Sequence, residues 1–261
     1  RLGKDHQVSL KLLPGLKASR LDDRVGLLRQ FDGIRRHADN TRMMDALDRF
    51  NQQALGILLS GKFGDALNLE KEDPKVLARY TPRHKQEGER YVTADGFNAS
   101  RKLLLARRLI EAGVRLVSIQ FGGWDTHRDN FNRLKDNNLP NLDDGLAGLF
   151  RALDSKGLLN STAVFVTGEF GRMPKINQRG GRDHYPRAMF CQLAGGGMQG
   201  GQVVGASDAK GEGPRDRVIS PDDVAATFYH ALGVDHTKEY HTPTGRPVMI
   251  VRHGKPIPEL V

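Results

Sequence analysis

The sequence contains one cysteine, few aromatic residues and no long apolar run. Cys191 is the only cysteine among 261 residues, which excludes an internal disulfide and a metal site built from several thiolates, and its apolar neighbours predict a buried position. No stretch approaches the roughly 20 apolar residues of a membrane-spanning helix, and no secretion signal opens the chain. Because the chain begins with Arg1 rather than Met, we expect a processed or excised fragment of a soluble protein.

Basic residues outnumber acidic ones. The chain has 40 Lys and Arg against 31 Asp and Glu, which gives a formal net charge of +9. The basic residues are spread along the chain without runs and without interleaved aromatic side chains, a pattern that argues against a nucleic-acid interface. A generally positive surface attracts anions, so we expect an anionic small molecule or polymer as the substrate.

Residues 1–96 are predicted to be a helical segment that packs on the core. Apolar residues recur every three or four positions over 21–34 and over 41–58, and each pattern predicts one apolar helical face. Gly61 is placed to end the second helix. Residues 81–96 are polar and charged, which is typical of a loop.

Residues 97–261 are predicted to be an α/β core that is continuous with the helical segment. The local signals predict a basic helix that ends at Gly113, a helix over 222–232 that begins with Ser220 as its cap, and a glycine-rich turn over 195–201. The remaining elements are a helix over 142–153, buried strands over 114–121, 162–167 and 188–194, and a peripheral strand over 246–251. Strands that alternate with helices predict a mostly parallel sheet sandwiched by helices.

Carboxylates and imidazoles follow the predicted strands. In open α/β sheets, ligands bind beyond the carboxyl ends of the strands, and the loops after Phe121 and Thr167 leave the sheet at that edge. We therefore expect one metal site, with a third loop contributing as well. Mixed oxygen and nitrogen donors suit Zn²⁺ or Mn²⁺ better than Ca²⁺ or Mg²⁺, which prefer oxygen. The candidate metal ligands are Asp125, His127, Glu169, Asp183 and His184.

The same loops carry arginines that can recognise an anion. The planar guanidinium groups of Arg172 and Arg182 match phosphate or sulfate in two-point contacts, so we interpret these residues as substrate-binding. Each loop also has a structural interpretation. Asp125 can cap the segment that follows it, Glu169 can pair with Arg172 in a surface turn, and Asp183 can form a salt bridge within its loop. His241 is a weaker candidate for an additional ligand.

Several of these motifs resemble one bacterial family. The matching segments are 106–115 (ARRLIEAGVR), 123–127 (GWDTH), 168–172 (GEFGR), 181–184 (GRDH) and 245–257. Together they resemble the domain-of-unknown-function family 1501, which is common in planctomycetes and is grouped with the alkaline phosphatase and sulfatase superfamily. The resemblance extends over roughly residues 21 to 260.

The resemblance implies an alkaline phosphatase-like sandwich whose metal centre hydrolyses phosphate or sulfate esters. It places Asp125, His127 and His184 at ligand positions, with Glu169 where the superfamily usually has an aspartate and Phe170 where it has a histidine. No segment before the first core strand resembles the strands that carry the superfamily's nucleophile. The chain therefore corresponds to the C-terminal part of such an enzyme. Family members often carry an export signal, which implies the periplasm or the cell surface.

Two functions follow from these expectations. The first is a metal-dependent hydrolase of the phosphatase or sulfatase type that acts on phosphate or sulfate esters. The alternative is a non-catalytic binding protein for sulfated or phosphorylated polymers on a degenerate hydrolase fold, which Phe170 and the missing nucleophile segment favour. A purely structural role is a third option.

Overall fold

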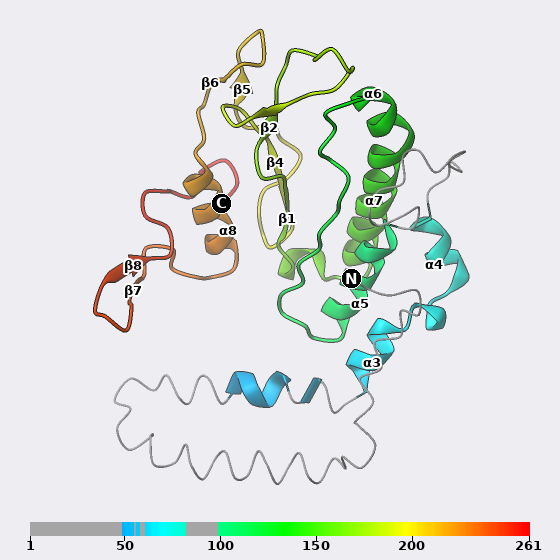
Figure 1. The fold of residues 1–261 in the computed structure, drawn as a ribbon. Coiled ribbons are helices and arrows are strands. Elements are labelled where there is room, and N and C mark those ends of the chain that lie inside the picture. The colour runs from blue at the N-terminus through cyan, green and yellow to red at the C-terminus, as the bar shows by residue number, and fades with distance from the viewer. Residues whose placement is uncertain (1–48, 55, 58–60, 82–98) are drawn as a thin grey trace. The chain divides into compact units, whose positions relative to one another are not determined.

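The structure of the chain is a computed structural model, and it describes residues 49–54, 56–57, 61–81 and 99–261 (Figure 1). The described residues fall into two compact units, one formed by residues 49–54, 56–57 and 61–81 together with Ser100–Gln120, and the other mainly by Phe121–Val261. The helix expected over 21–34, most of the helix expected over 41–58 and nearly all of the loop expected over 81–96 lie outside the described residues. The predicted boundary between residues 96 and 97 also lies there and stays a prediction.

The first unit contains short helices. They are α3 (Lys62–Leu67), the 3-10 helix η1 (Leu69–Lys71), α4 (Pro74–Arg79) and α5 (Arg101–Glu111). α5 confirms the predicted basic helix, because it buries Leu103 and Leu104 and is followed by Gly113 at a φ of 94°. Arg107 is only 4% exposed and pairs with the carboxylate of Glu72. The basic residues of α5 are therefore partly structural.

The strand predicted over 114–121 is wrong. This segment forms no ladder with another strand of the described residues, the chain bends at Arg115, and Leu116 is 76% exposed. Near its end, the backbone carbonyl of Gln120 accepts a hydrogen bond of 2.7 Å from Lys102 Nζ. The β-branched, largely apolar composition indicates a strand, but a strand forms only where a neighbouring backbone pairs with it.

One long helical stretch dominates the second unit (Figure 1). α6 (Asn130–Arg133), the π-helix η3 (Leu134–Asn138) and α7 (Leu139–Ser155) follow one another directly. Pro140 lacks an N–H and clashes with the carbonyl one turn earlier, which accounts for the wider turn at η3. α7 confirms the helix predicted over 142–153, with Leu149 and Leu153 buried.

The strands form four separate antiparallel pairs. β1 (Val164–Thr167) pairs with β4 (Cys191–Ala194), β2 (Gly171–Arg172) with β3 (His184–Tyr185), β5 (Ala206–Ser207) with β6 (Pro214–Asp216), and β7 (Glu239–His241) with β8 (Pro247–Met249). The described residues contain no extended parallel sheet. The prediction of a mostly parallel, alkaline phosphatase-like sandwich is therefore wrong.

The direction of the two central strands explains this error. Both were expected, and both are present, but Val164 lies opposite Ala194 and Thr167 lies opposite Cys191, so they run antiparallel. A parallel pair needs a long crossover, which is usually a helix, and residues 168–190 contain none. An apolar run predicts burial but carries no information about strand direction.

The C-terminal part follows its local signals closely. The hydroxyl of Ser220 accepts a hydrogen bond from the backbone of Asp223, and the Asp223 carboxylate accepts one in return, so a capping box begins α8 (Pro221–Ala231). Gly233 follows the helix at a φ of 68°. β8 confirms the predicted peripheral strand in a shorter form.

Two smaller expectations can also be compared with the structure. The glycine-rich segment 195–201 is a turn, closed by a 3.0 Å hydrogen bond from the Met198 N–H to the Gly195 carbonyl. Cys191 is half-buried rather than fully buried, and this burial raises the pKa of its thiol. Within the described part of the chain, no helix combines the length and apolar character that crossing a membrane requires.

Candidate metal centre

The loop before α6 and the loop that leads into β3 lie directly against each other. The Arg182 N–H donates to the Thr126 carbonyl at 3.0 Å, and Arg128 forms an antiparallel bridge with Gly180. A Cβ at Gly181 would lie 2.0 Å from the carbonyl carbon of His127, so only glycine allows this approach. The glycine thereby brings the 123–128 and 181–184 motifs together.

Three of the predicted ligands converge where these loops meet. The Nε2 atoms of His127 and His184 lie 3.0 and 2.9 Å from Asp125 Oδ1. The two Nε2 atoms are 3.2 Å apart. Asp125, His127 and His184 are thus a group whose donor atoms can hold a metal ion, and we call these three residues the cluster.

The spacing of these donors fits a small divalent ion. Ligands about 2.0–2.1 Å from a tetrahedral Zn²⁺ ion lie about 3.3 Å from one another. Donors around the larger Ca²⁺ ion, at about 2.3–2.6 Å, are spaced more widely and consist of oxygen atoms. Two imidazole nitrogens and one carboxylate oxygen form a mixed nitrogen and oxygen donor set, which divalent transition metals accept.

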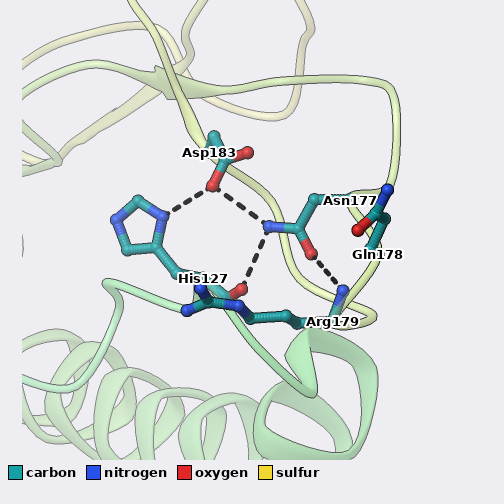
Figure 2. Close-up of a pocket in the computed structure, with 5 residues that line it drawn as sticks. All are labelled: His127, Asn177, Gln178, Arg179 and Asp183. Carbon is teal, nitrogen blue, oxygen red and sulfur yellow. Dashed lines mark hydrogen bonds and ion pairs between the residues drawn. The ribbon is translucent and has the colours of Figure 1, made fainter.

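Asp183 contacts the opposite nitrogen of the His127 ring. Its Oδ1 lies 2.8 Å from His127 Nδ1, outside the group of three donors (Figure 2). The same oxygen accepts a hydrogen bond of 3.0 Å from the Asn177 amide. The hydrogen bonds from His127 and then from Asn177 lower the pKa of the Asp183 carboxyl. Asp183 is thus placed to orient a ligand, as carboxylates behind metal-bound histidines commonly are.

Arg172 lies beside the cluster because the β2–β3 pair puts it opposite His184. Its Nη1 donates to Asp125 Oδ1 at 2.5 Å, and its Nη2 lies 3.4 Å from Glu169 Oε1. The hydrogen bonds from His184 and then from Arg172 lower the pKa of Asp125 to about 2. Glu169 therefore pairs with Arg172, and its carboxylate lies outside the group of three donors.

The side chain of Arg182, which was predicted to bind substrate, points away from the cluster and contacts other parts of the fold. Its Nη1 donates to the carbonyls of Met173 and Pro174 at 2.7 Å each, and its guanidinium lies 5.7 Å from the centre of the Phe131 ring. These contacts join the loop that carries Arg182 to the segment after β2 and to α6. Of the two arginines predicted to bind substrate, only Arg172 reaches the cluster.

Phe170 occupies the side of the cluster next to β3. Its ring centre lies 4.6 Å from that of His184, and the Arg172 guanidinium lies 5.7 Å from the same phenyl ring. The side chains of Asp125 and His184 remain 62% and 49% exposed. The cluster is therefore open to solvent and to a ligand on its free side.

Sequence reasoning missed Asn177. With His127, Gln178, Arg179 and Asp183, this residue lines an open hollow of about 350 Å³ beside the cluster (Figure 2). Asparagine is common in turns, and its hydrogen bonds depend on residues that are distant in sequence, so no local signal marks it. His241, the weaker ligand candidate, lies on β7 and is not part of the group of three donors.

The chain matches one family model. That model is described as "Protein of unknown function (DUF1501)" and matches residues 2–261, which confirms the family resemblance that the motifs predicted. No curated protein and no solved structure matches the chain.

Proposed function

The chain belongs to the DUF1501 family, and from its own side chains we propose that it is a metal-dependent hydrolase of phosphate or sulfate esters. The observation that carries the proposal is the convergence of Asp125, His127 and His184 on one point, with Arg172 beside them. The likeness of the motifs to those of the alkaline phosphatase and sulfatase superfamily supports the same chemistry. The proposed relationship of the chain to that superfamily rests on these motifs and not on the fold.

The proposal gives each residue a role. Asp125, His127 and His184 hold a divalent ion, with Zn²⁺ or Mn²⁺ the best match to their donor atoms. Such an ion supplies polarisation of the ester oxygen and stabilises charge on the leaving group. Arg172 offers a planar pair of donors to the anionic oxygens of the substrate.

The substrate and the location complete the proposal. The net charge of +9 and the exposed cluster suit an anionic small molecule or polymer. An exported location is proposed from the family resemblance alone.

A second function, non-catalytic binding of sulfated or phosphorylated polymers, has its own supporting observation. Two threonine hydroxyls near the motifs are both engaged in hydrogen bonds, that of Thr126 with Asn130 and that of Thr167 with the Gly168 carbonyl. The side chain that packs on His184 is that of Phe170, which has no atom that could bind a metal ion. A cluster whose nearby threonine hydroxyls are engaged in hydrogen bonds can bind an anion without turning it over.

An ester-hydrolysis assay separates the two functions. The full chain is incubated with p-nitrophenyl phosphate or p-nitrophenyl sulfate and added Zn²⁺ or Mn²⁺. We expect turnover that falls by more than about 100-fold in Asp125→Asn, because this change removes a charged ligand, and that is unchanged in Asp143→Asn, an exposed aspartate of α7. Absence of turnover, together with metal-independent binding of a sulfated polysaccharide, would establish the binding function instead.

A further inference from the structure

A single amide, that of Asn177, holds two groups around His127. Its Nδ2 donates to Asp183 Oδ1 and to the main-chain carbonyl of His127, each at 3.0 Å (Figure 2). Its Oδ1 accepts from the N–H groups of Arg179 and Gly181, each at 2.9 Å. The donor half of the amide therefore faces the cluster, while the acceptor half closes its own turn.

The contact between Asp183 and His127 determines which nitrogen of the His127 ring carries the proton. The other nitrogen then has a lone pair that is available to the cluster. An ionised carboxylate only accepts hydrogen bonds, so His127 Nδ1, at 2.8 Å from Asp183 Oδ1, carries the proton. The Nε2 lone pair of His127 then points towards Asp125 and His184. The orientation of this ligand depends on where Asp183 is held.

We propose that Asn177 is a positioning residue of the metal centre, which fixes the Asp183 carboxylate and the His127 backbone together and thereby aims His127 Nε2. The inference rests on the metal site proposed above and extends it to a residue that contributes no ligand atom. Hydrogen-bond partners behind a metal ligand commonly change metal affinity by about 10–100-fold when they are removed.

The two halves of the amide can be separated by one substitution. Asn177→Asp keeps an oxygen for the N–H groups of Arg179 and Gly181, so the turn retains its hydrogen bonds. It replaces the donor Nδ2 with a second oxygen, which faces Asp183 Oδ1 and the His127 carbonyl. The resulting repulsion displaces the carboxylate that orients His127.

The test measures metal affinity of the full chain after removal of metal. Zn²⁺ is titrated in competition with a chromophoric chelator, and Co²⁺ is titrated by its visible absorption. We expect Asn177→Asp to bind one ion about 10–100-fold more weakly than the unaltered chain, with an altered Co²⁺ spectrum. The matched control is Asn132→Asp, since Asn132 also donates to a carboxylate, that of Asp129 at 2.7 Å, but this carboxylate is not one of the three donors of the cluster and forms no hydrogen bond or ion pair with them. This variant should bind like the unaltered chain.

The outcomes distinguish this inference from the proposed function. Equal affinity in Asn177→Asp and in the unaltered chain would overturn the role of Asn177 and leave the metal site standing. A chain that binds neither ion would overturn both. If circular dichroism shows that Asn177→Asp does not fold, Asn177→Ala is measured in the same way, and unchanged affinity there overturns the inference.

A double variant tests the route through Asp183. Asn177 and Asp183 act as one unit in this account, so Asn177→Asp combined with Asp183→Asn should weaken binding no more than the larger of the two single changes. Losses that multiply would show that Asn177 affects the metal by another route, against the inference.

Discussion

Asp125, the carboxylate of the cluster, receives three side-chain contacts. His127, His184 and Arg172 all approach the same oxygen, Oδ1. The pKa of about 2 that results keeps this carboxylate charged at neutral pH. Because the side chain is 62% exposed, these pairs add little to folding stability. Their consequence is instead an ionised oxygen in a fixed position, which is what a cation needs.

The two arginines of the motifs should respond differently to the same substitution. Arg172→Met should weaken binding of inorganic phosphate to the metal-loaded chain by about 10–100-fold, because hydrogen bonds from a charged donor contribute about 1.5–3 kcal/mol. Arg182→Met should leave phosphate affinity unchanged and lower the free energy of unfolding by about 1–3 kcal/mol, because Arg182 donates to two carbonyls of the fold. Calorimetric titration and urea unfolding measure the two effects. Equal losses of phosphate affinity would refute the distinction.

At the scale of elements, short hairpins and close loop contacts build the site. β2 and β3 are two residues long each, yet they set Arg172 opposite His184. Gly181 then allows the loop before β3 to touch the backbone of His127. These contacts join the three motifs without a parallel sheet.

Gly181→Ala should separate the loops. Its Cβ would lie 2.0 Å from the His127 carbonyl carbon and 2.4 Å from the Arg128 nitrogen, and backbone atoms can avoid such contacts only by moving apart. We expect metal affinity to fall by at least about 10-fold while the far-ultraviolet circular dichroism stays unchanged. Gly213→Ala is the control, since its nearest neighbour would be 3.9 Å away. Normal metal affinity in Gly181→Ala would contradict this account of how the loops meet.

The C-terminal segment is joined to β6 by an ion pair whose contribution depends on pH. Arg217, which follows β6, donates to both carboxylate oxygens of Glu259 at 2.7 and 2.9 Å and lowers the pKa of Glu259 to about 2. A carboxyl with a lowered pKa stabilises the folded state above its unfolded value, near 4.5, and this stabilisation is lost as the pH falls towards 2.

Glu259→Gln should therefore be slightly less stable than the unaltered chain at pH 7, and the difference should shrink between about pH 4.5 and pH 2. Urea unfolding at several pH values measures it, with Glu212→Gln as an exposed control. A difference that grows on acidification would contradict the sign of the effect.

Local signals predicted the helices well and the sheets poorly. The cap at Ser220, the glycine at 113 and the helical pattern over 142–153 are local features, so α5, α7 and α8 were predictable. The pairing of β1 with β4 depends on residues almost thirty positions apart, and the apolar pattern of each strand is the same in either direction.

At the scale of the whole molecule, three of the five predicted ligands meet for a reason other than the predicted one. Asp125, His127 and His184 were expected together at the edge of a parallel sheet, whereas the close contact of Gly181 with the His127 backbone brings their loops together. Their residue types mark them as candidate donors. The roles of Asp183 and Asn177 were not, because they depend on which ring nitrogen each loop approaches.

The central claim is that these three side chains bind one divalent ion. Equilibrium dialysis of the full chain against Zn²⁺ or Mn²⁺, followed by elemental analysis, measures the bound metal directly. We expect about one ion per chain, lost in His184→Ala and retained in His253→Ala, which alters an exposed histidine outside the cluster. A chain that retains no metal, or a His184→Ala variant that retains as much as the unaltered chain, would contradict the account.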